Sequence, residues 1–98
     1  MSAYSEKEVR DKFLRKIKSI TDCWSRYEGK SNKERCEGVA FSILALIDGC
    51  AIDFPAINML LAPHPDDKQF FIDNDEDYFE EGILINNCCL HDLLDRSW

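Results

Sequence analysis

The segment His64-Pro65-Asp66-Asp67 places an imidazole and two carboxylates within four positions. These are the groups that a zinc-dependent hydrolase uses as metal ligands and as a general base. A complete site would also need His91, the one other histidine of the chain. The alternative is a hairpin loop stiffened by its prolines, in which the histidine and the aspartates hydrogen-bond to each other. We favour the loop and expect no catalytic residues in this chain.

The chain has five cysteines, an odd number, and no two of them are spaced as Cys-x-x-Cys. They are Cys23, Cys36, Cys50, Cys88 and Cys89. The spacing of the last two relative to His91 matches no standard zinc module. Residues 1–30 show no signal sequence, so we expect a cytoplasmic protein with reduced thiols, buried as small apolar side chains.

Acidic residues are concentrated between positions 66 and 81. Eight carboxylates lie there, opposed only by Lys68. The segment 73–77 begins like a calcium loop, but an EF-hand needs glycine at its sixth position and glutamate at its twelfth. This chain has Tyr78 and Leu84 at those places. This excludes an EF-hand and leaves loose calcium binding as an alternative; we expect no bound metal and no other cofactor.

Such a concentration of like charge costs stability through repulsion. Two interpretations stay open: a solvated loop kept acidic for solubility, and a surface that binds a positively charged protein. Two aromatic residues lie inside the cluster, and aromatic side chains within a polar rim are typical of protein interfaces. The predicted partner-binding residues are Asp66, Asp67, Asp73, Asp75, Glu76, Asp77, Tyr78, Phe79, Glu80 and Glu81.

The charge of the whole chain, −7, is unevenly divided. Residues 1–36 carry ten basic and six acidic side chains, a net +4, whereas residues 37–98 carry two and thirteen, a net −11. The acidic balance disfavours nucleic acid and anionic membranes as partners, because both carry negative charge themselves. No apolar run approaches the roughly 20 residues that span a bilayer. A length of 98 residues with 45% apolar composition predicts one globular domain, 1–98.

Two helices are expected in the first half of the chain. Serine followed three residues later by glutamate, the spacing of a capping box, occurs at Ser5 and again at Ser31. Apolar residues then recur every three or four positions, which predicts a first helix over 5–28 and a second from about 31 to 48. The second contains small residues at helical spacing, Gly38 among them, that would let another element approach closely.

Three short strands are expected after the helices, over 57–62, 68–72 and 83–86, separated by loops with proline, asparagine and glycine. Short connections imply antiparallel pairing. A short helix over 88–96, with Asn87 as its cap, would end the chain. The predicted fold is therefore α+β with two layers: two N-terminal helices, a three-stranded antiparallel sheet and a short C-terminal helix.

Two resemblances bear on function. The segment 64–67 resembles the H-P-D-D motif of zinc-dependent N-acetylglucosaminyl deacetylases of the LmbE type, which implies zinc bound by the histidine and one aspartate, with the other as base. That family has glutamate next, where this chain has Lys68, and needs a later H-x-x-H segment that this chain lacks.

Residues 31–98 also resemble a small uncharacterised bacterial protein family. The resemblance is carried by Glu37-Gly38-Val39-Ala40-Phe41-Ser42-Ile43-Leu44, Ile47-Asp48-Gly49, Pro63-His64-Pro65-Asp66-Asp67-Lys68 and Leu90-His91-Asp92. In size and charge the chain is similar to immunity proteins of polymorphic toxin systems, including contact-dependent growth inhibition. That similarity implies a cytoplasmic inhibitor that binds a toxic domain, often a nuclease.

We therefore predict a non-catalytic immunity protein that binds and neutralises a basic toxin domain through its acidic surface. Three alternatives stay open. One is a phage or mobile-element accessory protein that binds a host factor or a small ligand, with His64 and His91 lining the pocket. Another is a zinc hydrolase at His64, Asp66 and Asp67. The third is a homodimer whose contact is made by Phe70 or Trp98.

Overall fold

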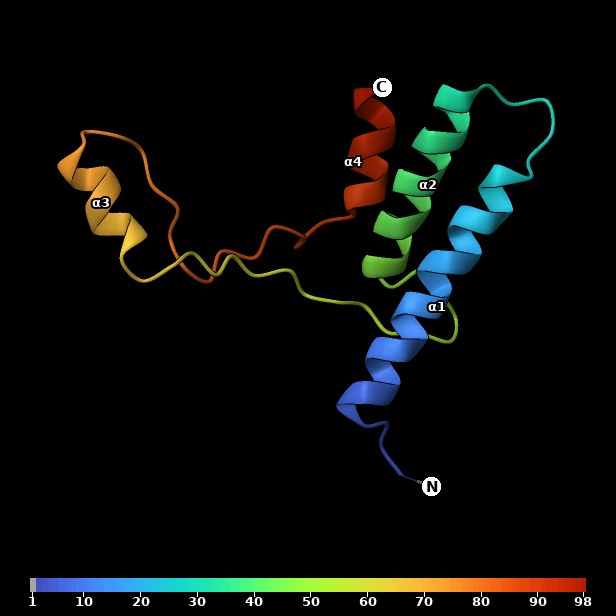
Figure 1. Ribbon diagram of the computed structural model, residues 1–98, viewed down its shortest axis with the longest axis horizontal. Helices are drawn as coiled ribbons and strands as arrows, with labels where there is room; N and C mark the ends of the chain where they lie inside the picture. Colours follow the sequence, from blue (N-terminus) through green and yellow to red (C-terminus); the bar gives the residue numbers. More distant parts are fainter. Residues whose placement is uncertain (1) are drawn as a thin grey trace.

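The computed structural model describes residues 2–98, which form four helices (Figure 1). They are α1 (Glu6–Ser25), α2 (Asn32–Ile47), α3 (Asp67–Asp73) and α4 (Leu90–Ser97). Helices α1 and α4 both pack on α2, and these three make up the body of the molecule. Helix α3 lies at the end of a long arm that projects from the body (Figure 1). We call residues 57–62 and 82–86 the stem of the arm and residues 63–81 its tip.

The predicted α+β fold is wrong, because residues 2–98 contain no sheet and the chain is mainly helical. Segments 57–62 and 83–86 run antiparallel, but they share only an isolated bridge between Leu60 and Leu84. The second predicted strand, 68–72, lies within α3. Asn87 is not the cap of the last helix, since Cys89 occupies the N-cap position of α4.

Three backbone hydrogen bonds and two of the Asn86 side chain join the two halves of the stem. The Ile85 N–H donates to the Met59 carbonyl at 3.0 Å. At the base of the stem the Asn86 side chain accepts from the Met59 N–H at 2.8 Å and donates to the Ile57 carbonyl at 2.5 Å. A side chain thus takes the place of the next backbone pair. A two-stranded ribbon of this kind is marginal in water unless another surface covers it.

Both long helices begin where the sequence predicts. In each capping box the serine Oγ accepts from the backbone N–H of the glutamate, and the glutamate carboxylate accepts from the serine N–H. These hydrogen bonds from Ser5 and Ser31 hold the pKa of Glu8 and Glu34 below the usual range. Helix α1 ends at Ser25, somewhat before the predicted end at 28.

Gly38 allows α1 and α2 to pack closely. The Trp24 ring of α1 lies against it, and the Trp24 Nε1 donates to the Ser42 Oγ at 2.9 Å. A Cβ built on Gly38 would lie 2.5 Å from the Trp24 ring. The predicted close approach of another element to the small residues of this helix is therefore confirmed.

Substituting Gly38 with alanine is expected to destabilise the protein by about 2 kcal/mol, because the indole and the added methyl group cannot share the space. In an open helix the same change stabilises, by roughly 0.5–1 kcal/mol. Urea unfolding followed by circular dichroism measures the difference. Lys33→Ala, on the exposed side of the same helix, serves as control and is expected to change stability by less than about 0.5 kcal/mol. A stabilised Gly38→Ala protein would contradict the packing described here.

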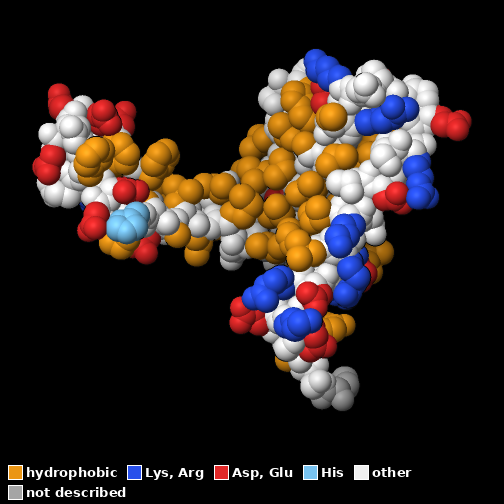
Figure 2. Space-filling view, in the orientation of Figure 1, with side chains coloured by type: hydrophobic (Ala, Val, Ile, Leu, Met, Phe, Trp, Pro, Cys, Tyr) orange, Lys and Arg blue, Asp and Glu red, His pale blue; other side chains and the backbone are white. Residues whose placement is uncertain are grey.

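The molecule is extended and buries little. Its radius of gyration is 17.4 Å, against about 13 Å for a compact domain of this length. Leu46 and Phe54 are the apolar side chains of residues 2–98 that are almost fully buried. Apolar side chains remain visible over the body and along the arm (Figure 2). A chain that folds this way leaves an unusually large part of its apolar surface for other contacts.

Candidate functional site

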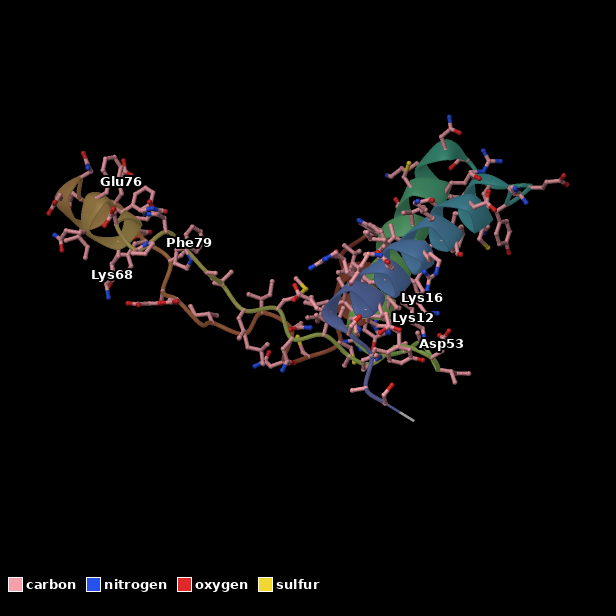
Figure 3. All side chains as sticks on the ribbon, turned by 60° about the horizontal axis from the view of Figure 1, so that its bottom comes forward. Lys12, Lys16, Asp53, Lys68, Glu76 and Phe79 are labelled. Atoms are coloured by element: carbon pink, nitrogen blue, oxygen red, sulfur yellow. The ribbon has the colours of Figure 1, made fainter. Side chains whose placement is uncertain are left out.

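The tip of the arm holds all ten residues predicted to bind a partner. Asp67 and Asp73 are the first and last residues of α3, Asp66 precedes that helix, and the other seven follow it. Figure 3 shows Glu76 and Phe79 together at the end of the arm, far from Lys12 and Lys16 on the body. The fold thus gathers the acidic segment into one projecting unit.

Lys68 is the one basic residue of the tip and is engaged within it. Its Nζ lies 2.9 Å from the Glu80 Oε1 and 5.1 Å from the centre of the Tyr78 ring. The hydrogen bond and the charge of Glu80, together with Tyr78, raise the pKa of Lys68. These contacts fasten the segment after α3 back onto the first turn of that helix. Because Lys68 is already paired with Glu80, it does not neutralise the other carboxylates of the tip.

Local hydrogen bonds stabilise the helix over residues 67–73 and the turn in which the chain reverses direction after it. The Asn74 side chain donates to the Phe70 carbonyl at 2.7 Å, and the Gln69 side chain donates to Asp73 at 2.7 Å. Asp75 then has a φ of 57°, in the left-handed region that non-glycine residues rarely adopt. The Glu76 N–H returns to the Phe71 carbonyl at 2.9 Å and closes the turn.

Two aromatic side chains of the tip face solvent. Phe79 is 70% exposed and Phe70 is 59% exposed. Phe70 meets Phe71 edge to face, with ring centres 5.5 Å apart, so one ring supports the other. Large exposed aromatic side chains surrounded by carboxylates have the composition of a protein-binding surface, in which an apolar anchor sits within a polar rim.

His64 belongs to a locally hydrogen-bonded loop, as the sequence analysis favours. Its Nδ1 accepts from the Asp66 N–H at 3.2 Å, and its carbonyl accepts from the Asp67 N–H at 3.0 Å. His91 begins α4 in the body, so the stem separates the two histidines. The structure does not bring them into a shared pocket. Across residues 2–98, no three His, Cys, Asp or Glu side chains are grouped so as to hold a metal ion.

A second cluster joins α4 to the end of α2. The Asp48 Oδ2 accepts from the His91 N–H at 3.0 Å and lies 2.6 Å from the His91 Nδ1. The Asp48 side chain is 2% exposed and that of His91 is 13% exposed. The other ring nitrogen, Nε2, lies 3.9 Å from the Cys50 Sγ. The Cys50 thiol, the His91 imidazole and the Asp48 carboxylate therefore lie in a row in space, in the order found in thiol hydrolases.

The surroundings favour a structural clamp over catalysis. A thiol nucleophile needs neighbours that stabilise the thiolate, such as cations. Here carboxylates lie nearby instead: desolvation by the surrounding chain, followed by the charges of Asp92 and Asp48, raises the pKa of the neighbouring Cys89 thiol. We therefore interpret the Asp48–His91 pair as the contact that holds α4 on α2. The cysteines themselves are exposed and free, so the prediction that they are buried is wrong.

Asp48 was not among the predicted site residues, although one signal in the sequence points to it. An aspartate at the C-terminal end of a helix faces the negative end of the helix dipole, which is unfavourable without a partner. Asp48 occupies the C-cap of α2. Its use as an acceptor for the backbone and ring of His91 supplies that partner, from 43 residues further along the chain.

Comparison of this chain with family models, with curated proteins and with solved structures gives no match. Among the helices of residues 2–98, none has the length and apolar character needed to cross a membrane.

Proposed function

We propose that this chain is a protein-binding module without catalytic activity, whose arm tip docks on a positively charged surface of another protein. The sequence resemblance suggests a specific form: a cytoplasmic immunity protein whose partner is a toxin domain. The observation that carries the proposal is the joint placement of acidic and exposed aromatic residues at the end of a projecting arm.

The electrostatics of the tip support this proposal. In the part of the chain that the structure describes, Glu80 is the only tip carboxylate paired with a lysine or arginine. Like charges held together raise the free energy of the unbound protein, and a cationic surface relieves that repulsion. A field of one sign also speeds the encounter with an oppositely charged partner, by roughly 10 to 1,000-fold at low salt.

The chemistry of a nuclease toxin would match this tip. A nuclease binds phosphate groups and therefore carries clustered lysine and arginine side chains. A tip rich in carboxylates competes with the nucleic-acid backbone for those side chains, and Phe79 adds apolar contact. Neutralisation would then be occlusion of the substrate site.

Co-expression with the product of the neighbouring upstream gene tests the proposal. The unmodified chain is expected to abolish the toxicity of that product, and a variant carrying Glu76→Lys, Asp77→Lys and Glu81→Lys is expected to lose protection. Asp75 is left unchanged because lysine is strained at its positive φ, and Glu80 because it holds Lys68. The salt dependence of binding is expected to fall in the variant as well.

A control variant makes the same change of charge on the body, through Asp22→Lys, Glu28→Lys and Asp95→Lys, all at exposed positions. It is expected to protect as well as the unmodified chain. An upstream product that is harmless would contradict the immunity function. Full protection by the tip variant would remove the tip from the interface.

A further inference from the structure

The arm leaves more surface exposed than a chain of this size normally does. The accessible surface is 7816 Å², about 2,000 Å² above the value expected for a compact monomer of this mass. A stable interface buries about 800 Å² on each partner. Much of the excess is apolar and lies on the arm, at Leu60, Phe70, Ile72, Phe79, Ile83 and Ile85.

The body carries a surface whose composition is complementary to the tip. Arg15 and Lys18 are exposed on α1, and no carboxylate of residues 2–98 lies within ion-pair distance of either. Lys12, one turn before, lies over the Tyr4 ring at 5.1 Å. Leu14, which is half exposed, lies one turn before Lys18, at the edge of this group. We call Lys12, Arg15 and Lys18 the basic face of α1.

We infer that two copies of this chain form a twofold dimer, in which the tip of each arm docks on the basic face of α1 of the other copy. The inference rests on the proposed function of the tip, the binding of cationic protein surfaces. The division of charge into +4 and −11 makes a second copy a complementary partner. The tip cannot meet its own basic face in this conformation, because the arm projects away from α1 (Figure 3).

The twofold symmetry accounts for the stem as well. Two arms that reach in opposite directions pass each other near the axis, and there Leu60, Ile83 and Ile85 of each stem become covered. Every contact in such a pair occurs twice, so two tip contacts and one central contact act together. A toxin and a second copy would occupy the same tip, and toxin binding therefore dissociates the dimer.

Mass in solution, measured by sedimentation equilibrium, gives the first test. The unmodified chain is expected to show twice 11.4 kDa. Two variants are expected to dimerise at least about a hundredfold more weakly. The tip variant carries Glu76→Lys, Asp77→Lys and Glu81→Lys, and the helix variant carries Lys12→Glu, Arg15→Glu and Lys18→Glu. Circular dichroism confirms that each has kept its helices.

Mixing the two variants is the decisive measurement. The three substitutions lower the net charge of the tip from −7 to −1, and those of the helix variant make the basic face acidic, so each variant alone loses the complementarity of its tip contacts. In a mixed pair, the unmodified tip of one copy meets the unmodified basic face of the other, and the three new lysines meet the three new glutamates. An equimolar mixture is therefore expected to form a one-to-one heterodimer. The control variant Arg26→Glu, Lys30→Glu and Lys33→Glu changes the charge equally at the turn between α1 and α2, and is expected to stay dimeric.

The inference is overturned by a monomeric unmodified chain, by a dimer that survives both sets of substitutions, or by a mixture that stays monomeric. The helix variant separates this inference from the proposed function, because its tip is unchanged. If that variant and the unmodified chain protect against the toxin while the mixing experiment fails, the dimer alone is wrong. If mixing restores the dimer and neither protects, the proposed toxin partner is wrong.

Discussion

Replacing Phe79 with alanine is expected to weaken binding of a basic protein partner by about 30 to 1,000-fold, which corresponds to roughly 2–4 kcal/mol. The side chain is 70% exposed in the free chain and lies among carboxylates at the end of the arm. Such an aromatic ring gains most of its burial on binding, so its removal is expected to speed dissociation. Titration calorimetry and stopped-flow dissociation with the purified toxin domain measure both quantities.

Ile52→Ala is the matched control for this substitution, because Ile52 is a fully exposed apolar residue on the body. It is expected to leave the affinity unchanged. The charge variant of the tip differs from Phe79→Ala in kind, since loss of rim charge mainly slows association and reduces the dependence on salt. An affinity that Phe79→Ala does not alter would show that the tip contributes charge alone, and would contradict an aromatic anchor.

Replacing Asp48 with alanine is expected to destabilise the protein by about 3 kcal/mol. The change removes the acceptor of the His91 N–H and of the His91 ring, and leaves both groups poorly solvated next to Phe41. Helix α4 is expected to detach from α2 before the α1–α2 pair unfolds. Thermal unfolding gives the overall loss, and hydrogen exchange shows whether α4 loses its protection first.

A double-mutant cycle checks that the two side chains act as a pair. His91→Ala is expected to destabilise by a similar amount, and the double variant by clearly less than the sum. Asp95→Ala, at an exposed position of α4, is the control and is expected to have an effect below about 0.5 kcal/mol. Additive effects of Asp48→Ala and His91→Ala would contradict the clamp.

The sequence predicted the helices of the body well because their signals are local. A serine and a glutamate three residues apart satisfy the first free N–H groups of a helix, whatever the rest of the chain does. Both capping boxes are formed, at Ser5 and at Ser31. The close packing of Trp24 on Gly38 was likewise visible as small residues at helical spacing.

The arm was predicted poorly because its signals are ambiguous. A five-residue segment such as 68–72, in which only the last three residues are apolar, suits a strand or one turn of a helix equally well. Side-chain hydrogen bonds from Gln69 and Asn74 to positions four residues away favour the helix. The stem segments are extended as expected, but the Asn86 side chain replaces a backbone partner at their base, so no ladder forms.

The candidate site was likewise predictable where its residues are close in sequence, and unpredictable where they are far apart. The ten acidic and aromatic residues are near neighbours in sequence, so their gathering in one tip was predictable. The Asp48–His91 clamp joins residues far apart in the sequence. The one sign of it in the sequence is the unfavourable position of an aspartate at the C-terminal end of a helix. The sequence could not show that the arm projects from the body, because that depends on contacts that are missing rather than on residues that are present.

Photo-crosslinking tests the central claim, that the tip of the arm is the surface that meets a positively charged protein. A photoreactive phenylalanine analogue is placed at position 79 in one sample and at position 52 in another, and each is irradiated with the co-expressed partner. We predict crosslinks from position 79 to lysine- and arginine-rich peptides, of the toxin or of α1 of a second copy, and none from position 52. Crosslinks from position 52 alone would contradict the claim.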